Sequence, residues 1–332
     1  MLNADTFRHL TRLAVFGLAA GSIVVAAASW LALIAPPLDL LNQVAPFWLL
    51  VALAGLAAVR FGLRERRERL LASIAFAAAA LAHTTLIAPE LLRPASETVT
   101  ANTDAPRVRI VWLNTQSGSS PEGVTEYLAN SGADFLLLAE YHPEGNAIPE
   151  GIRSAYPYLA ACLEPHDCNV VILSRHAPLA QRPTYAESEA GLRMVWADFS
   201  IDGAPLRLVG THLHRPYPAR RYAERRGELL EFIADSEDNM ILAGDFNAAP
   251  WSFALRHFDE RSGLTRHDRA MPTWPAAEWT RLRLPAPIAF LPIDHIYSSG
   301  SWTLVSINRG PRTGADHFPI EAEFVWSPAR QR

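Results

Sequence analysis

Three long apolar runs fill most of the first ninety residues, and they constrain the fold more than any other feature. Residues 13–35, 40–59 and 70–88 contain no Asp, Glu, Lys or Arg. About 20 apolar residues suffice for a helix to cross a bilayer. The first run could instead be a signal peptide, and the runs could form a buried helical hairpin. We expect three transmembrane helices in a membrane domain of residues 1–90, with the alanine-rich third run giving the weakest signal.

The arginines predict the orientation of these helices. Arg8 and Arg12 precede the first run, the short loop at 36–39 has no arginine, and residues 60–69 contain five. Positively charged loops stay in the cytoplasm. The pattern therefore predicts a multi-pass protein of the inner (cytoplasmic) membrane with a cytoplasmic N-terminus. Everything after about residue 90 is then expected to be periplasmic, or otherwise outside the cytoplasm.

Residues 91–106 are rich in Ser, Thr, Ala and Pro, which is typical of a linker. We expect one domain over 107–326 and a short tail at 327–332. From residue 107 onward there are 22 Arg against 27 Asp plus Glu. This balance argues against the broad basic face of a non-specific DNA binder. Cys162 and Cys168 would form a small disulfide loop in an oxidising compartment, or remain two unpaired thiols.

Short apolar runs alternate with helical patterns throughout the predicted domain. Strands are expected over 107–114, 134–140, 169–175, 194–201, 205–213, 241–247, 293–300, 302–310 and 320–326, and helices over 123–132 and 220–236. Asp202-Gly203 between two of the strands is typical of a hairpin turn. Strands mixed with helices over about 220 residues indicate a layered α/β or α+β domain.

Polar side chains recur where the apolar strands are expected to end. They are Asn114, Glu140, His212, Asp245 with Asn247, Asp294 with His295, and Asp316 with His317. One such residue is usually only a turn former. Six such strand ends are harder to dismiss, because strand ends at one sheet edge lie together in space and buried polar groups must be satisfied.

The residue types favour one kind of chemistry. Carboxylate and amide oxygens suit Mg²⁺ or Mn²⁺ rather than Zn²⁺. Imidazoles beside carboxylates serve as general acids and bases, or stabilise developing negative charge. A metal, an acid/base histidine and amide donors together suit the hydrolysis of a phosphate ester.

The chain resembles the endonuclease/exonuclease/phosphatase superfamily, which includes DNase I and neutral sphingomyelinases. The resemblance covers about residues 107–326 and rests on VWLN, LLLAE, VVILSR, GTHL, LAGDFN, PIDHIY and GADHFPI in the family's order. PTWP at 272–275 and the apolar runs resemble a membrane-anchored bacterial branch. The resemblance implies a four-layer sandwich, in which two packed mixed β-sheets are flanked by helices.

The resemblance also implies a role for each matched residue. Glu140 would be the main metal ligand, with Asp316 and Asn114 also near the metal. Asp245 would orient or deprotonate the attacking water. Asn247 and Asn114 would bind the phosphate, and His212 would assist the leaving oxygen. His317 would act as the acid/base or transition-state histidine, with Asp294 fixing its ring. Ala139 and Ala315 replace the Gln and Ser common in the family, which leaves fine positioning open.

Other polar and aromatic residues have plainer expected roles. His295 follows Asp294 on a strand and should point to the opposite face. Trp251 and Trp274 are expected to pack, with stacking on a base or lipid as the alternative. Four arginines share the helix at 220–236, which should be mostly a solvated face, with anion docking as the alternative: Arg220, Arg221, Arg225 and Arg226.

Three functions are therefore compared. The first is a membrane-anchored phosphoesterase that acts on nucleic acid, a phospholipid or a small phosphoester. The second is a catalytically inactive phosphate-binding module on a membrane anchor, which the filled catalytic positions argue against. The third places the function in the membrane helices themselves. His83 is their only ionisable residue, so a simple anchor in the lipid bilayer is the better interpretation. No protein partner is indicated.

Overall fold

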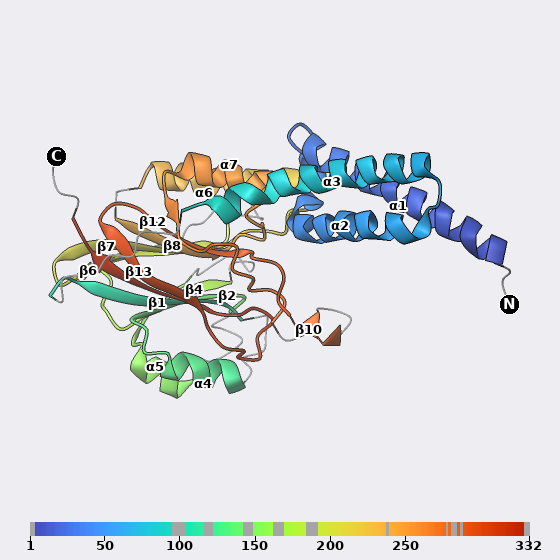
Figure 1. Ribbon diagram of the computed structural model, residues 1–332. Helices are drawn as coiled ribbons and strands as arrows, with labels where there is room; N and C mark the ends of the chain where they lie inside the picture. Colours follow the sequence, from blue (N-terminus) through green and yellow to red (C-terminus); the bar gives the residue numbers. More distant parts are fainter. Residues whose placement is uncertain are drawn as a thin grey trace. The chain divides into compact units, whose positions relative to one another are not determined.

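The computed structural model divides the chain into two compact units, and each is described by itself (Figure 1). The structure describes residues 4–94, 104–115, 122–141, 149–161, 169–183, 192–236, 239–276, 278–279, 284–285 and 288–328. Cys162 and Cys168 lie outside these ranges, so the expected disulfide stays a prediction. One unit comprises Met1–Arg93 with Ala249–Arg256, and the other comprises Pro94–Ala248 with His257–Arg332.

The first unit contains three helices that are long and apolar enough to cross a membrane. They are α1 (Ala4–Leu31), α2 (Ala45–Gly62) and α3 (Arg66–Leu92), with short 3₁₀ turns η1 (Pro36–Leu40) and η2 (Asn42–Val44) before α2. Helix α1 begins well before residue 13 and ends before residue 35. The apolar run marked what can lie in lipid, whereas backbone hydrogen bonds carry the helix through Arg8 and Arg12. Pro36 and Pro37 follow the helix, and proline cannot continue it.

Helices α2 and α3 approach each other closely where small residues face large ones. A Cβ added to Gly55 would overlap the ring of Phe76. Phe76 is fully buried, as are Ala52 and Ala79. The missing side chain at residue 55 therefore makes room for the aromatic ring on the neighbouring helix.

The second unit contains two six-stranded mixed sheets. The first sheet has the order β13-β14-β1-β2-β4-β3, and the second has the order β5-β6-β7-β8-β12-β9. The strands of the first sheet are β1 (Arg107–Asn114), β2 (Phe135–Ala139), β3 (Tyr158–Ala161), β4 (Val170–Ser174), β13 (Trp302–Arg309) and β14 (Ile320–Trp326). Those of the second sheet are β5 (Ala180–Pro183), β6 (Met194–Ile201), β7 (Ala204–His212), β8 (Met240–Asp245), β9 (Thr265–Arg266) and β12 (Asp294–Ser298).

The two sheets stack and are flanked by helices, which confirms the predicted four-layer sandwich (Figure 1). Helices α4 (Glu122–Asn130) and α5 (Glu150–Ala155) lie beside the first sheet, and α6 (Ala219–Ala234) and α7 (Phe253–Ser262) lie beside the second. A small hairpin pairs β10 (Glu278–Trp279) with β11 (Leu284–Pro285). The hairpin turn between β6 and β7 is also confirmed, because Asp202 and Gly203 both have positive φ.

Alternation along β1 explains how its sheet is covered on both faces. Ile110 and Trp112 belong to the core shared with the second sheet, whereas Val111 and Leu113 pack with residues of α4 and α5. Successive side chains of a strand point to opposite faces. Asn114 continues the series of Ile110 and Trp112, so this register brings its side chain to the inter-sheet side.

The structure corrects one expectation about where the polar residues lie. Asp294 begins β12 instead of ending a strand, and Asp316 and His317 precede β14. Strand β12 runs antiparallel to β8, with Asp294 paired to Asp245, and β14 runs antiparallel to β1. The start of an antiparallel strand lies at the same sheet edge as the end of its neighbour, so the expected convergence still occurs.

Candidate active site

The predicted catalytic residues converge on Asp245, the last residue of β8. Oδ2 of Asp245 accepts a hydrogen bond from Asn114 Nδ2 at 3.1 Å. The same oxygen lies 3.8 Å from Nε2 of His212 and 3.8 Å from Nε2 of His317. The side chain of Asp245 is 2% exposed. A single carboxylate thus faces groups from β1, from β7 and from the loop before β14.

The turn after β8 holds Asn247 in an unusual backbone conformation. Asn247 has a φ of 49°, in the left-handed region that a non-glycine residue seldom occupies. Its backbone N–H donates to Asp245 Oδ1 at 2.8 Å, and its Nδ2 donates to the Leu213 carbonyl at 2.9 Å. These two bonds fix the side-chain amide of Asn247 two residues after the carboxylate of Asp245. Glu140 also has a positive φ, of 54°.

His317 and Asp294 form a buried hydrogen-bonded pair. Nδ1 of His317 lies 2.7 Å from Asp294 Oδ2. Trp112 Nε1 donates to Asp294 Oδ1 at 2.8 Å, and the Thr273 hydroxyl donates to Oδ2. Asp294 therefore accepts three hydrogen bonds while fully buried, which is the condition under which a carboxylate stays charged away from water.

Burial and charge set the protonation of this pair. Burial alone would lower the pKa of His317, but the charge and hydrogen bond of Asp294, with Asp245 and Asp316, outweigh it and raise that pKa to about 10. Burial would likewise raise the pKa of Asp294, but His317, Thr273 and Trp112 lower it. His317 is thus an imidazolium near neutral pH, with Nε2–H directed toward Asp245.

The pKa of Asp245 is raised and the pKa of His212 is lowered, so both groups favour their neutral forms. Burial, followed by the charge of Asp294, raises the pKa of Asp245 to about 7. Burial lowers the pKa of His212 to about 3, despite the nearby charge of Glu140. His212 is therefore neutral, and its Nδ1 lies 3.2 Å from Asn169 Oδ1. Since an amide oxygen only accepts, Nδ1 carries the proton and Nε2 is left as an acceptor.

Glu140, Asn114 and Asp316 form an oxygen-rich region beside this cluster. Asn114 Nδ2 lies 3.4 Å from Glu140 Oε1, and Glu140 Oε1 lies 3.9 Å from His212 Nε2. Burial raises the pKa of Asp316, and the charge of Glu140 raises it further. Trp274 Nε1 donates to Asp316 Oδ2 at 3.4 Å, whereas Oδ1 is buried with no hydrogen-bond partner among the described residues.

These donors fit a hard divalent cation. Two carboxylates that repel each other and one orphaned carboxylate oxygen would all be satisfied by such an ion, and oxygen donors suit Mg²⁺ or Mn²⁺. By spacing alone, Asp245, Asp294 and His317 also form a group that could hold a metal. We favour Glu140, Asn114 and Asp316, because Asp294 and His317 already bond each other and a protonated imidazole cannot ligate a metal.

Four residues that support the site were not predicted from the sequence to have that role. Trp112 and Thr273 hold Asp294, Asn169 orients His212, and Trp274 bonds Asp316. Trp112 could have been found, because it lies two residues before Asn114 and so shares its face. Trp274 was expected only to pack. The other contacts join loops far apart in sequence, so no local pattern marks them.

The remaining expectations are resolved outside the site. His295 is fully buried and bonds Asp268 instead of joining His317, as the strand alternation predicted. Trp251 is buried in the helical unit, where its Nε1 donates to the Gln43 carbonyl at 3.0 Å. On α6, Arg220 pairs with Glu224 on the exposed face, but Arg225 is buried and bonds Glu228. The helix is therefore not a wholly solvated face.

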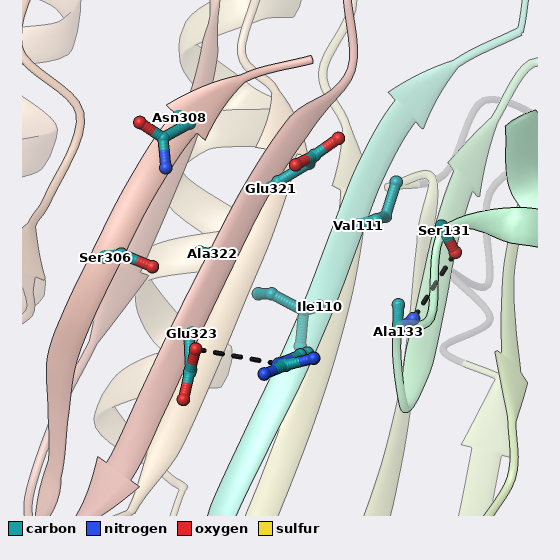
Figure 2. Close-up of a pocket in the computed structure, with 10 residues that line it drawn as sticks. Ile110, Val111, Ser131, Ala133, Ser306, Asn308, Glu321, Ala322 and Glu323 are labelled. Carbon is teal, nitrogen blue, oxygen red and sulfur yellow. Dashed lines mark hydrogen bonds and ion pairs between the residues drawn. The ribbon is translucent and has the colours of Figure 1, made fainter.

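A shallow groove of about 210 Å³ lies on the first sheet, outside this cluster (Figure 2). Figure 2 shows Ser306, Glu321 and Glu323 projecting from β13 and β14, beside Ile110 of β1. Arg109 pairs with Glu323 at 3.6 Å across it. None of the predicted site residues lines this groove, so it has no part in the chemistry considered below.

The fold and the site define a phosphoester hydrolase. The chain belongs to the endonuclease/exonuclease/phosphatase family, whose sequence model matches residues 111–317. The family's enzymes hydrolyse phosphate esters, and the resemblance stated from the motifs is confirmed. No curated protein sequence is significantly similar to the chain.

Solved structures support the same fold. D. rerio TDP2 complexed with a single-strand DNA product is 16% identical, with a TM-score of 0.55, and the match covers 66% of this chain and 98% of that one. A family member from Bacteroides thetaiotaomicron is 14% identical, with a TM-score of 0.52 over 68% and 99% of the two chains. One from Beutenbergia cavernae is 16% identical, with a TM-score of 0.51 over 68% and 73%. At these identities the likeness establishes the fold alone.

Proposed function

We propose that the protein is a membrane-anchored, divalent-metal-dependent phosphoesterase in which water attacks a phosphodiester or phosphomonoester. The observation that carries the proposal is the imidazolium of His317, held by Asp294 and directed toward Asp245. A fixed cationic donor beside a carboxylate with a pKa of about 7 supplies both charge stabilisation and a base near neutral pH.

Each residue contributes a defined task in this scheme. Glu140, Asn114 and Asp316 would hold Mg²⁺ or Mn²⁺, which would supply Lewis-acid stabilisation of the phosphoryl group. Asp245 orients the attacking water and accepts its proton. Asn247 and Asn114 bind a phosphate oxygen through their amides. His317 stabilises the negative charge that develops on the phosphoryl group, and neutral His212 lies beside the leaving oxygen.

We further propose that the three helices anchor the domain in the inner membrane, with a cytoplasmic N-terminus and the active site on the periplasmic or outer side. The arginine distribution around the apolar runs supports this orientation. Within the helical unit, the loop between α1 and α2 bonds residues 249–254, which continue the chain of the catalytic domain. That contact requires the loop and the domain to share one side of the membrane, as three spans provide.

The proposed location outside the cytoplasm restricts which substrates the domain can reach. A domain outside the cytoplasm would act on extracytoplasmic nucleic acid or on phospholipids and their headgroups. The domain's excess of acidic residues does not favour tight sequence-independent DNA binding. A substrate presented by the membrane itself agrees better with the anchor and with this charge.

The test uses the full chain purified in detergent. It is assayed with Mg²⁺, with Mn²⁺ and with EDTA on a generic phosphodiester, a phosphomonoester, plasmid DNA, RNA and phospholipid vesicles. We expect metal-dependent turnover that His317→Ala abolishes and that His176→Ala, at a surface histidine outside the site, leaves unchanged. A folded protein that binds Mg²⁺ and phosphate but turns over no substrate would instead support the inactive binding module.

A further inference from the structure

One peptide group just after the catalytic turn is hydrogen-bonded on both of its sides. The carbonyl of Ala248 lies 2.8 Å from Nε2 of His295, whose Nδ1 lies 2.7 Å from Asp268. The N–H of Ala249, in the same peptide group, donates to Gln43 Oε1 at 2.7 Å. All of these side chains are buried. The backbone that leaves the active site is therefore fixed by a histidine of β12 and by a glutamine of the loop before α2.

The same loop holds the next residues as well. Both carboxylate oxygens of Asp39 accept backbone N–H groups at the start of α7, from Phe253 at 3.0 Å and Ala254 at 2.9 Å. Trp251 Nε1 donates to the Gln43 carbonyl. Residues 249–256 accordingly belong to the compact unit of the three helices. Four hydrogen bonds tie this segment to two side chains and one carbonyl of the loop between α1 and α2.

Burying the polar side chains of Asp39 and Gln43 in an apolar helical unit costs free energy, and each side chain has only a few hydrogen-bond partners. Asp39 is 6% exposed and bonds Asn42 in addition to the two N–H groups of α7. Gln43 is 6% exposed, and its Nε2 has no hydrogen-bond partner among the described residues. Its carbonyl oxygen, which bonds Ala249, is thus the part of the side chain that is used. Buried polar groups are destabilising unless they are hydrogen-bonded.

The held segment begins two residues after Asn247. In the turn after Asp245, Asn247 adopts a left-handed conformation, which persists only where the surroundings over-determine it. The bonds of Asn247 to Asp245 and Leu213 restrain it from one side. The fixed peptide group at Ala248 and Ala249 restrains it from the other.

We infer that Asp39 and Gln43 are positioning residues of the active site. They touch neither substrate nor metal, and they act through the backbone of residues 249–254 on the placement of Asp245 and Asn247. The inference rests on the proposed function for its catalytic consequence. It makes the helical unit a part of the enzyme's working structure as well as its anchor, since the loop between the first two helices completes the support of the catalytic turn.

The test compares full-length variants in detergent with bis(p-nitrophenyl) phosphate as the substrate. Gln43→Leu and Asp39→Ala should lower kcat about tenfold while KM stays within about twofold, because small misplacements of reacting groups are costly in rate. Gln43→Glu keeps an acceptor oxygen at the same position and should retain most of the rate. Trp48→Phe is the matched control: it removes a hydrogen bond to the Leu41 carbonyl in the same loop and leaves Asp39 and Gln43 unchanged.

Hydrogen exchange gives a readout that does not depend on turnover. Peptides covering residues 244–258 should lose protection in Gln43→Leu and Asp39→Ala, but not in Trp48→Phe. Wild-type kcat together with wild-type protection in both variants would overturn the inference. If the wild-type protein turns over no phosphoester, the proposed function fails, and the exchange of this segment still decides whether the loop holds it. A variant that fails to fold is recognised by lost protection across both sheets. If Asp39→Ala fails to fold, Gln43→Leu against Gln43→Glu carries the comparison, and if Gln43→Leu fails, Asp39→Ala against Trp48→Phe carries it.

Discussion

Replacing Asp294 with asparagine tests whether the imidazolium of His317 drives the reaction. Asp294 Oδ1 faces the Trp112 N–H, and Oδ2 faces both Thr273 and His317. An asparagine has one acceptor and one donor group in place of two acceptors. If its oxygen stays with Trp112, its NH₂ group faces Nδ1 of His317. Nδ1 must then be unprotonated, and the ring loses the charge that holds its pKa near 10.

The size of the effect follows from this change in protonation. With a pKa of about 10, His317 is fully protonated at both pH 5.5 and pH 7.5. With an ordinary pKa of about 6.5, roughly nine-tenths is protonated at pH 5.5 and one-tenth at pH 7.5. In the variant, burial still lowers the pKa of His317, and the charges of Asp245 and Asp316 still raise it. With the ordinary value, the protonated fraction should rise about tenfold on going from pH 7.5 to pH 5.5. Loss of a general acid/base group commonly costs about 10²–10⁴ in rate.

The assay measures kcat/KM of wild type and Asp294→Asn at saturating Mg²⁺ across that range. The ratio of variant to wild type is taken at each pH. The variant loses the charge of Asp294, which raises the pKa of Asp245, together with the charge of His317, which lowers it, so the two changes act on Asp245 in opposite directions. We expect a ratio of about 10⁻² or lower at pH 7.5 that increases about tenfold by pH 5.5. A ratio that is low but independent of pH would refute the protonation argument, since the variant would then have lost geometry instead of charge.

Three further outcomes follow from the site and its surroundings. Asp245→Asn should lower kcat by at least about 10²-fold, with an unchanged circular dichroism spectrum. Asp316→Asn should weaken Mn²⁺ binding about tenfold or more by calorimetry, since it removes the orphaned oxygen. Asp268→Asn should destabilise the fold by about 3–5 kcal/mol in urea unfolding, because it breaks a buried pair with His295. Because the pKa of Asp268 is lowered in the folded protein, this group stabilises the fold fully at pH values above about 3.8. Because the pKa of His295 is raised, this group stabilises the fold fully at pH values below about 6.5. The variant's loss of stability should therefore be largest between these two pH values.

Local pattern predicts much of this fold because its strands are covered on both faces. Alternation in β1 separates Ile110 and Trp112 from Val111 and Leu113, and it places Asn114 at the inter-sheet face. Strand direction is not local. Whether β12 runs with or against β8 depends on the path of more than forty intervening residues. For that reason, Asp294 at the start of β12 and Asp316 and His317 before β14 were assigned to the wrong strand ends.

The support of the site is harder to foresee than the site itself. Trp112 and Asp294 are 182 positions apart, and His212 and Asn169 are 43 apart. Each contact forms only once both sheets are packed. Tryptophan, threonine and asparagine also serve many structural purposes, so none of them signals a partner alone. The grouping of residues 249–256 with the helices has the same origin, since Asp39 and Gln43 meet a segment more than 200 positions away.

The balance of charges at the site bears on the binding of both the metal and the substrate. The site gathers four carboxylates, of Glu140, Asp245, Asp294 and Asp316. The imidazolium of His317 and the nearby guanidinium of Arg193 oppose them, while His212 stays neutral. Four negative charges against two positive ones leave an excess of two when every carboxylate is ionised. Burial raises the pKa values of Asp245 and Asp316, and the charges of neighbouring carboxylates raise them further. A phosphate ester is itself an anion, so it would be repelled from this site alone. A bound divalent cation would offset the excess and favour the ionised forms of Asp245 and Asp316, and His317 would remain the cationic donor that faces the phosphate. In the proposed mechanism, metal binding and substrate binding therefore meet the same electrostatic requirement of these residues.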